Sequence, residues 1–279
     1  MAKKPLRFDE IGYWSEVKLE IVQKYAKAYS TILASKPSIH GHAYIDAFAG
    51  AGTHVSKRTG QEVLGSPAIA LQTTPPFTQL HFIDLDGSRV AELEKLASGD
   101  SRVTVHRGDC NAILLSDVFP RCEYRDYRRA LCLLDPYGLN IDWRVLETAG
   151  KMKSVDIFYN FMIMDANMNV FMRDPGKVAP EQAARMDAVW GDGTWRTAAY
   201  RKSTDLFGET EEKATNEEIA EAFRQRLKKA AGFKYVPNAM PMRNSRGAVI
   251  YYLYFASQNE TGGKIVTDIF NTYRDAGVS

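Results

Sequence analysis

Four apolar segments of this chain each end in a turn that carries an aspartate, and this recurrence constrains the fold more than any other feature. The aspartates are Asp46, Asp84, Asp109 and Asp135, and a segment that is expected to be helical follows each one. Parallel strands that alternate with helices bring their carboxyl ends to one edge of a sheet, where ligands bind. The sequence therefore predicts an α/β fold with a mostly parallel sheet and a ligand site at its acidic edge.

The spacing of apolar residues along the chain predicts the other helices and strands of this fold. A helix is expected over 14–32, from apolar residues at three- and four-residue spacing, and another over 217–229. Strands are expected at 43–48, 80–85, 103–106, 130–134, 155–160, 235–240 and 248–256. We expect one domain over 1–279, with an N-terminal helical extension at 1–40 and a mainly helical insert at 162–230. This predicts seven strands with helices on both faces, and the insert precedes the last two strands.

The stretch HAYIDAFAGAGTH, from His42 to His54, opens this arrangement as a buried strand that runs into a loop. Gly50 and Gly52 lack a Cβ and tolerate positive φ, so the backbone of this loop can approach a ligand closely. A polar loop is expected over 53–64, and the next helix is expected to begin with Ser66 as N-cap and Pro67 as first residue. The glycines therefore do not run straight into a helix, and a third glycine at dinucleotide-fingerprint spacing is missing, which disfavours a diphosphate cofactor.

The acids that follow the next two strands suit a nucleoside. A carboxylate at the end of the second strand can accept two hydrogen bonds from ribose hydroxyls; Asp84 is the candidate and Asp86 competes with it. Asp109 can accept from an exocyclic adenine amine, and it can also cap the helix that follows.

Composition limits the partners. The formal net charge is +2, so a nucleic-acid partner must be argued from local patches, of which residues 121–129 (RCEYRDYRR) are the most basic. We expect that segment at the amino-terminal edge of the sheet, as a solvated surface. Cys110, Cys122 and Cys132 form no CxxC pair, and the five histidines lack paired acidic motifs, so neither a disulfide framework nor a metal site is predicted. The sequence lacks an apolar run that could span a membrane, and we expect a cytoplasmic protein.

These motifs together resemble the class I S-adenosylmethionine-dependent methyltransferases. The resemblance with motifs covers about residues 40–160. More specifically, the chain resembles the three-Cys-motif partner proteins, a bacterial and phage-associated methyltransferase-like family named after cysteines in a presumed partner protein. The stretches that carry this likeness are YIDAFAGAGTH, GSPAIAL, FIDLD, GDCN, LLDPYGLNIDW and YYLYFAS followed by KIVTDIF.

The resemblance implies a role for each motif residue. The methionine part of S-adenosylmethionine would be surrounded by Asp46, Phe48, Gly50 and Gly52; the ribose would be held by Asp84; and the adenine would lie by Asp109 and Cys110. The methyl-transfer centre would comprise Asp135, Pro136 and Tyr137. Substrate contacts are assigned to Lys57, Arg58, Arg243 and Arg246.

The turn at Asp135 departs from the Asp/Asn-Pro-Pro-aromatic turn of nucleic-acid amino-methyltransferases. Its third and fourth residues are Tyr137 and Gly138, which is closer to the Asp-Pro-Phe-Gly turn of transfer-RNA guanine-N2 methyltransferases. The sequence thus predicts direct methyl transfer to an amine of a nucleic-acid base. A protein or small-molecule methyltransferase, and a non-catalytic partner or binding protein of a phage- or mobile-element-associated system, remain alternatives; a dehydrogenase is disfavoured by the glycine loop.

Overall fold

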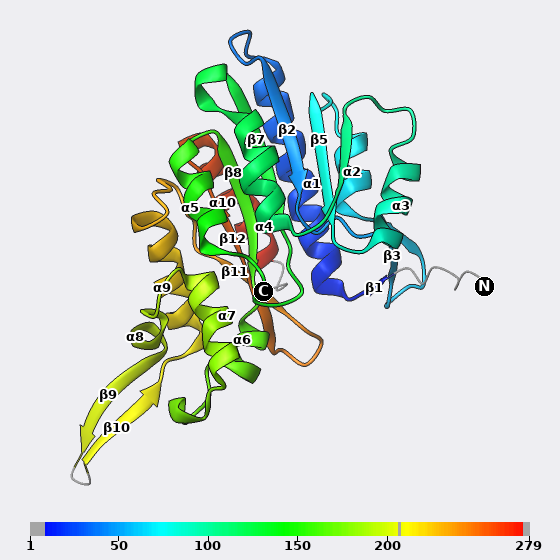
Figure 1. Cartoon of the computed structure of the whole chain (residues 1–279). Coiled ribbons are helices and arrows are strands. Elements are labelled where there is room, and N and C mark those ends of the chain that lie inside the picture. Colours follow the sequence, from blue (N-terminus) through cyan, green and yellow to red (C-terminus); the bar gives the residue numbers. More distant parts are fainter. Residues whose placement is uncertain (1–8, 206–207, 276–279) are drawn as a thin grey trace. The chain divides into compact units, whose positions relative to one another are not determined.

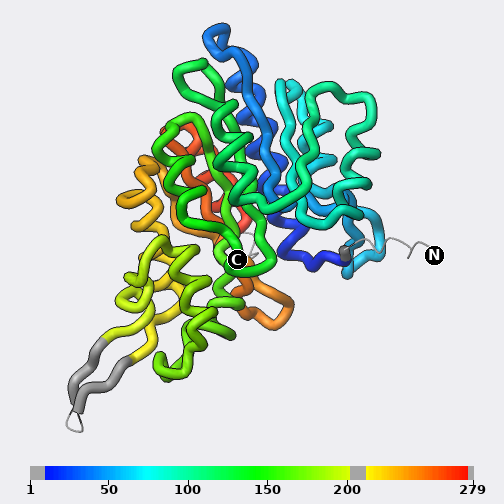
Figure 2. The backbone as a smooth tube through the Cα atoms, in the orientation of Figure 1, coloured from blue at the N-terminus to red at the C-terminus, as the bar shows by residue number. Residues whose placement is uncertain are grey.

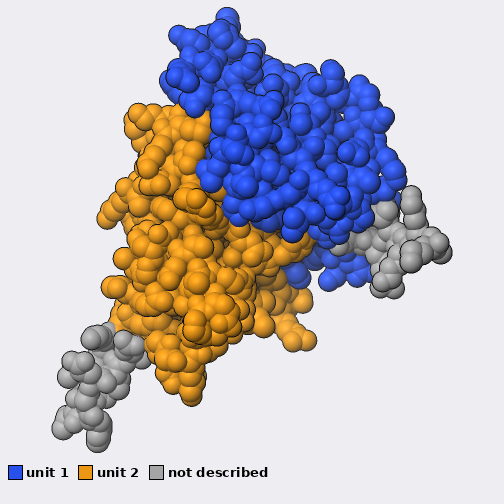
Figure 3. All heavy atoms as spheres, in the orientation of Figure 1, with its two compact units in different colours: residues 1–133 blue, residues 134–279 orange. Residues whose placement is uncertain are grey.

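The structure of the chain is a computed structural model that describes residues 9–205 and 208–275. The chain divides into two compact units, residues 1–133 and 134–279 (Figure 3). Residues 1–8 of the expected N-terminal extension lie outside the described residues. Among those that are described, no helix is both long and apolar enough to cross a membrane.

The first unit contains the parallel part of the main sheet. Its strands are β2 (Gly41–Asp46), β5 (Gln79–Asp84), β6 (Val103–Arg107) and β7 (Arg128–Leu134), hydrogen-bonded in the order β7-β2-β5-β6 and all parallel. In chain order this is fourth, first, second and third, so the order reverses between β2 and β7. Such a reversal, at the carboxyl ends of the strands, is where ligands bind in open α/β sheets. Every residue of β2 is buried, as expected for a strand covered on both faces.

The helices of this unit are α1 (Tyr13–Ala34), α2 (Ser66–Gln72), α3 (Gly87–Leu96) and α4 (Cys110–Ile113) (Figure 1). The amphipathic helix expected over 14–32 is confirmed as α1, which contacts β2 and α2 through its buried face. The expected start of α2 is off by one residue. Its N-cap is Gly65, and Ser66 is already helical, because the chain passes so close to Gly52 that Gly65 N donates to Gly52 O at 2.9 Å.

The polar loop expected over 53–64 is instead a small β-hairpin. Its strands β3 (Thr53–Ser56) and β4 (Glu62–Leu64) are antiparallel, and β1 (Asp9–Ile11) pairs in parallel with β3. These strands are short and mostly half-buried, and they lack the apolar alternation that would have predicted them.

The second unit contributes β8 (Val155–Phe161), β11 (Met240–Arg243) and β12 (Val249–Ala256) to the sheet. β12 is antiparallel to both β8 and β11. The seven strands thus form a mixed sheet with helices on both faces, which confirms the α/β class (Figure 1). The expected mostly parallel sheet is corrected to a mixed one by the antiparallel β12. The strand expected at 235–240 begins later. Tyr235 makes one isolated bridge to Ser257, and the ladder resumes at Met240, because Pro237 has no N–H to donate.

The segment between β8 and β11 contains mostly helices and ends in a helix against the sheet. Its elements are α6 (Ile163–Asn169), a 3₁₀ turn (Pro175–Lys177), α7 (Pro180–Trp190), α8 (Trp195–Ala199), β9 (Tyr200–Asp205), β10 (Gly208–Lys213) and α9 (Asn216–Lys229). The antiparallel hairpin of β9 and β10, which the sequence did not predict, extends away from these helices (Figure 1). Figure 2 traces the backbone of the segment from α6, in light green, to α9, in yellow to orange. The unit is completed by α5 (Trp143–Met152) and α10 (Glu260–Asp275).

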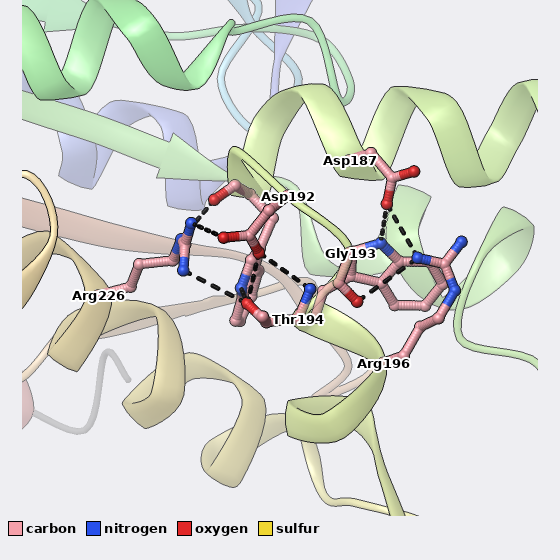
Figure 4. A network of polar contacts seen from close by, with 8 residues as sticks. Asp187, Asp192, Gly193, Thr194, Arg196 and Arg226 are labelled. Carbon is pink, nitrogen blue, oxygen red and sulfur yellow. Dashed lines mark hydrogen bonds and ion pairs between the residues drawn. The ribbon is translucent and has the colours of Figure 1, made fainter.

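Phe223 of α9 fixes this insert to the core of the second unit. Its ring lies 4.7 Å from that of Phe161 and 5.4 Å from that of Trp190, measured between centroids, and it is fully buried. The loop WGDGTW adds a polar network, in which Arg226 faces Asp192 and Thr194 while Arg196 faces Asp187 (Figure 4). The insert is therefore a packed part of the second unit.

Candidate functional site

The glycine loop after β2 is tied to the end of β5. The N–H of Gly50 donates to Asp84 Oδ2 at 3.0 Å, and the N–H of Ala49 donates to the Ile83 carbonyl at 3.0 Å. Asp46, which ends β2, is fully buried and accepts from the N–H of Phe48 at 3.3 Å. The structure therefore brings Asp46, Gly50 and Asp84 together at the carboxyl edge of the parallel strands.

The two glycines of this loop have different reasons to lack a side chain. Both have positive φ, 65° at Gly50 and 80° at Gly52. A Cβ on Gly52 would lie 2.5 Å from Leu96 Cδ2, so a side chain there would also have to displace the end of the Leu96 side chain in α3. A Cβ on Gly50 would meet its nearest atom, in His54, at 4.0 Å. Space above the backbone is therefore open at Gly50, and that is where a ligand can approach.

The hydrogen bonds of Asp84 and Asp86 distinguish the roles of these two aspartates. Asp86 caps α3, accepting from Ser88 N and Ser88 Oγ at 2.7 Å each, and these bonds lower the pKa of its carboxyl group. Asp84 is 8% exposed and accepts from Gly50 N and, at 2.8 Å, from Asp86 N, with Arg89 Nη1 3.8 Å from Oδ2. The capping role accounts for Asp86, so Asp84 is the acid that the structure joins to the glycine loop.

Leu85, between these two aspartates, is a residue of the site that sequence reasoning missed. Its side chain is 73% exposed, although it directly follows a buried strand. An exposed leucine next to a carboxylate that faces a glycine loop offers an apolar surface to a flat ring. The signal in the sequence was an apolar residue in a turn where polar residues are the rule.

Asp109 and Cys110 begin α4, after β6. Asp109 is exposed and caps the helix by accepting from Asn111 N at 3.2 Å, so the capping role expected for it is confirmed. Cys110 is buried, and burial followed by the charge of Asp109 raises the pKa of its thiol to about 12. At neutral pH this thiol is protonated, so Cys110 can pack against a ligand but cannot act as a nucleophile.

In the second unit, the turn that follows β7 is held from two sides. Asp135, at the first position, accepts at Oδ1 a hydrogen bond from Nδ2 of Asn160, a fully buried residue of β8. Tyr251 of β12 faces the same carboxylate. Its pKa is raised well above its usual range by burial and, to a lesser degree, by the charge of Asp135. Neither Asn160 nor Tyr251 was predicted from the sequence.

Asp165 of α6 organises the other end of this turn. Its Oδ2 accepts from Leu139 N and from Arg185 Nη2 at 2.9 Å each, and its Oδ1 accepts from Asn169 Nδ2 at 2.5 Å. A Cβ on Gly138 would lie 2.6 Å from Asp165 Oδ2. This explains the glycine in Asp-Pro-Tyr-Gly, because a larger residue there would displace Asp165. Pro136 is buried, whereas Tyr137 is 65% exposed.

The predicted substrate cations lie in two regions; Lys57, Arg58 and Arg246 are exposed and Arg243 is half-buried. Lys57 and Arg58 follow β3, where the guanidinium of Arg58 is 3.8 Å from Glu16 and lies 5.5 Å from the ring of Tyr13. Arg243 ends β11 and donates to the Gly247 carbonyl at 3.0 Å, and Arg246 lies in the turn between β11 and β12. Arg58 is thus engaged with α1 rather than with the glycine loop.

Other groups that could carry chemistry are buried or internally satisfied. All three cysteines are free and buried, and the described residues contain no group of three or more His, Cys, Asp or Glu side chains that could hold a metal ion. A cavity of about 580 Å³ lies in the insert next to β9, lined in part by Arg196 and Arg201. Each of these arginines is paired with an acid, Asp187 or Glu218 respectively, so the cavity has little net charge to attract an anion.

No protein-family model and no curated protein matches the sequence. In structure, the chain is similar to protein LPL1258 of Legionella pneumophila, with 12% identity over 95% of this chain and 94% of that chain and a TM-score of 0.53. A further similarity is to an S-adenosylmethionine-dependent methyltransferase of Leishmania major, with 11% identity, coverage of 87% and 82%, and a TM-score of 0.37.

The strand order of the first unit, the antiparallel β12 and the glycine loop define the class of this chain. It is an α/β protein with a class I methyltransferase-like, Rossmann-like fold. The first unit holds one candidate region, where the loop from Asp46 to Gly50 meets Asp84 and Leu85. The second unit holds a separate one, the turn at Asp135.

Proposed function

We propose that this chain is an S-adenosylmethionine-dependent methyltransferase whose acceptor is an amino group of a nucleic-acid base. The observation that carries the proposal is the hydrogen bond from Gly50 N to Asp84 Oδ2. It joins a loop with open space above its backbone to a carboxylate that is followed by an exposed leucine. A nucleoside fits these groups, since ribose hydroxyls suit Asp84 and an adenine ring suits Leu85.

The same site disfavours a diphosphate. α2 begins at Ser66, well after the glycines, so its N-terminal N–H groups do not follow the loop directly as they do in a dinucleotide site. The acids Asp46 and Asp84 also outnumber the one guanidinium that the structure describes beside them, that of Arg89, so they suit a cationic nucleoside better than a diphosphate.

The turn at Asp135 supplies the proposed chemistry. S-adenosylmethionine would provide a methyl group that the sulfonium charge makes electrophilic. Asp135 would accept a hydrogen bond from the acceptor amine and align its lone pair, with Asn160 fixing the carboxylate and the buried Pro136 fixing the turn. Tyr137, being 65% exposed, would stack on the base. Transfer would leave neutral S-adenosylhomocysteine and move the positive charge to the acceptor nitrogen, which would then release a proton to solvent. Catalysis would therefore come mainly from alignment in a site of matched polarity.

Calorimetry with S-adenosylmethionine tests the cofactor half. We expect Asp46→Ala to abolish binding and Leu85→Ala to weaken it about five- to tenfold, with unfolding unchanged because Leu85 is exposed. Leu64→Ala is the matched control, since Leu64 is 43% exposed on β4. If wild-type protein gives no heat at millimolar cofactor, the non-catalytic binding protein becomes the better proposal.

Transfer of a tritiated methyl group to pools of RNA, DNA and protein tests the acceptor. We expect label in a nucleic-acid pool, and we expect Asp135→Ala to lose transfer while it keeps cofactor binding. Label found in the protein pool alone would mean that the acceptor is a protein and not a nucleic acid. Unchanged transfer in Asp135→Ala would remove that residue from the mechanism.

A protein partner with a three-Cys motif also belongs to the proposal, and it is supported by the sequence resemblance. Co-purification of such a protein with the tagged chain is the expected result, and a chain that methylates its acceptor at full rate without any partner would argue against it.

A further inference from the structure

A surface of aromatic and basic side chains lies at the start of β7, at the opposite end of that strand from the acidic edge. We call it the tyrosine–arginine patch; it consists of Tyr124, Arg125, Tyr127, Arg128 and Arg129. Both tyrosines are 52% exposed, although large apolar side chains of this protein are mostly buried. Two half-exposed rings three residues apart are an unusual amount of apolar surface for a short turn.

One of the rings carries a stacked guanidinium. Arg129 Cζ lies 3.9 Å from the centroid of the Tyr124 ring, and Arg129 Nη1 donates to the Arg128 carbonyl at 2.7 Å. The guanidinium is therefore held flat against the tyrosine with a fixed orientation. A flat cation and an aromatic ring side by side are the groups on which nucleic-acid bases stack.

The second tyrosine sits at a backbone conformation that glycine would adopt at lower cost. Tyr127 has φ 56° and ψ 30°, and it ends the 3₁₀ turn of Tyr124–Asp126. A bulky residue in this left-handed region costs on the order of 1 kcal/mol, and such strain gathers at functional sites. Its carbonyl accepts from His40 N at 3.0 Å, and its ring lies 5.2 Å from that of His40, which holds the turn in place.

The arginines of the patch are not neutralised by neighbouring acids. In the described ranges, Arg125, Arg128 and Arg129 form no ion pair, and Glu123 and Asp126 form none either, while Arg121 just outside the patch is paired with Asp117 at 2.6 Å. Arg128 contacts a neutral partner, Gln79 Oε1, at 3.4 Å. Three cations that are free to meet phosphates thus surround two exposed rings.

We infer that the tyrosine–arginine patch binds single-stranded nucleic acid, with bases stacked on Tyr124 and Tyr127 and phosphates near the arginines. This replaces the solvated-surface interpretation of residues 121–129 suggested by the sequence. The inference rests on the proposed function for the identity of the strand as substrate. The patch and the acidic edge lie at opposite ends of β7, which has seven residues and is therefore about 20 Å long. The patch would thus hold the nucleic acid at a distance from the transfer site.

Fluorescence anisotropy with a labelled 20-nucleotide RNA of mixed sequence, measured without cofactor, tests the patch directly. We expect the double variant Tyr124→Ala/Tyr127→Gly to bind at least about tenfold more weakly, since each stacked base contributes to affinity. Tyr127→Gly also relieves the left-handed strain, so the variant should fold. Arg129→Gln should lower both the affinity and its salt dependence. Tyr13→Ala is the matched control, since Tyr13 is 47% exposed and lies near Arg58.

The outcomes separate the patch from the proposed function. Equal binding by the double variant and wild type, equal binding of the same sequence as a duplex, or no binding of the strand by wild type would each overturn the patch. Cofactor calorimetry and methyl transfer to the RNA pool are measured separately. A protein that methylates RNA with unchanged strand affinity in the patch variants would therefore keep its proposed function and lose this inference.

Discussion

Asn160 donates from Nδ2 to Asp135 Oδ1, yet its own Oδ1 is buried and has no hydrogen-bond partner within the described part of the chain. Leaving a buried carbonyl oxygen unsatisfied costs about 1–3 kcal/mol. The amide cannot turn round to relieve this, because Oδ1 would then face the carboxylate of Asp135. A destabilising group is thus retained where it fixes the acid of the turn, as expected if the position serves function rather than stability.

Replacing Asn160 by leucine should therefore separate stability from activity. We expect Asn160→Leu to change the free energy of unfolding by less than about 1 kcal/mol, because removing the unsatisfied oxygen offsets the hydrogen bond that Asp135 loses. Methyl transfer should fall about tenfold or more, because Asp135 loses its fixed orientation. Urea denaturation and tritium transfer measure the two effects, with Asn271→Leu on the exposed side of α10 as control. A less stable variant with full activity would contradict this interpretation.

Gly138 and Asp165 should be energetically coupled. We expect Gly138→Ala to destabilise the protein by about 1–3 kcal/mol, because its Cβ would lie 2.6 Å from Asp165 Oδ2. In an Asp165→Ala background the same substitution should cost about 1 kcal/mol less, which a double-mutant cycle on urea denaturation measures. Gly176→Ala is the control, since its Cβ would meet its nearest atom, in exposed Asp174, at 3.3 Å. Additive effects would show that the turn does not depend on this contact.

The sequence was sufficient to predict a strand where its local apolar pattern agrees with its burial in the fold. β2 and β5 were predictable because buried parallel strands are continuous apolar segments, and their ends were marked by Asp46 and Asp84. The hairpin at 53–64 was not, because its pairing with β1 joins residues more than forty positions apart and its strands are short and only half-buried.

The candidate site shows the same division. The acids at the strand ends could be named from the sequence, since their position follows from the alternation of strands and helices. Their partners could not, because Asn160 lies 25 residues from Asp135 and Leu139 lies 26 residues from Asp165. Such contacts depend on how elements pack, which the spacing of residue types does not encode.

His81 and His106 form a pair that was not predicted from the sequence, and this pair should make the stability of the protein depend on pH. His81 Nδ1 lies 3.2 Å from His106 Nε2, and burial, then the charge of His106, lowers the pKa of His81 to about 4. The pair faces Asp117, which is 3.5 Å from His106 and paired with Arg121. Between pH 6.5 and 4 the unfolded chain binds a proton at His81 that the folded chain does not, so stability falls as pH falls through this window.

The contribution of His81 to this loss should amount to about 3 kcal/mol at pH 4 relative to pH 7.5. Burial also lowers the pKa values of His42 and His106, which add to the loss, and carboxyl groups with lowered pKa values, such as Asp117 beside Arg121, extend it below pH 4. Urea denaturation at a series of pH values measures it. His81→Leu should flatten the dependence, while His40→Gln, in an exposed histidine, should leave it in place. An unchanged slope in His81→Leu would assign the effect to other groups.

Arg226 should hold α9 to the loop from Trp190 to Trp195 and to Trp143 of α5. Its guanidinium donates to Asp192 Oδ2 at 2.7 Å and to the Trp190 carbonyl, and it lies 4.7 Å from the ring of Trp143 (Figure 4). We expect Arg226→Ala to lower the free energy of unfolding by about 2 kcal/mol, because the Trp190 carbonyl and the ring of Trp143 lose a largely buried partner.

Arg226→Lys should recover less than half of this loss, since one ammonium cannot reach both acceptors in the geometry of a guanidinium. Arg144→Ala removes the same charge from an exposed pair with Asp142 and should cost less than about 0.5 kcal/mol in urea denaturation. If Arg226→Ala and Arg144→Ala lowered the free energy of unfolding equally, the contacts of Arg226 with the loop from Trp190 to Trp195 would not stabilise α9. The packing of Phe223 would then be what fixes this helix.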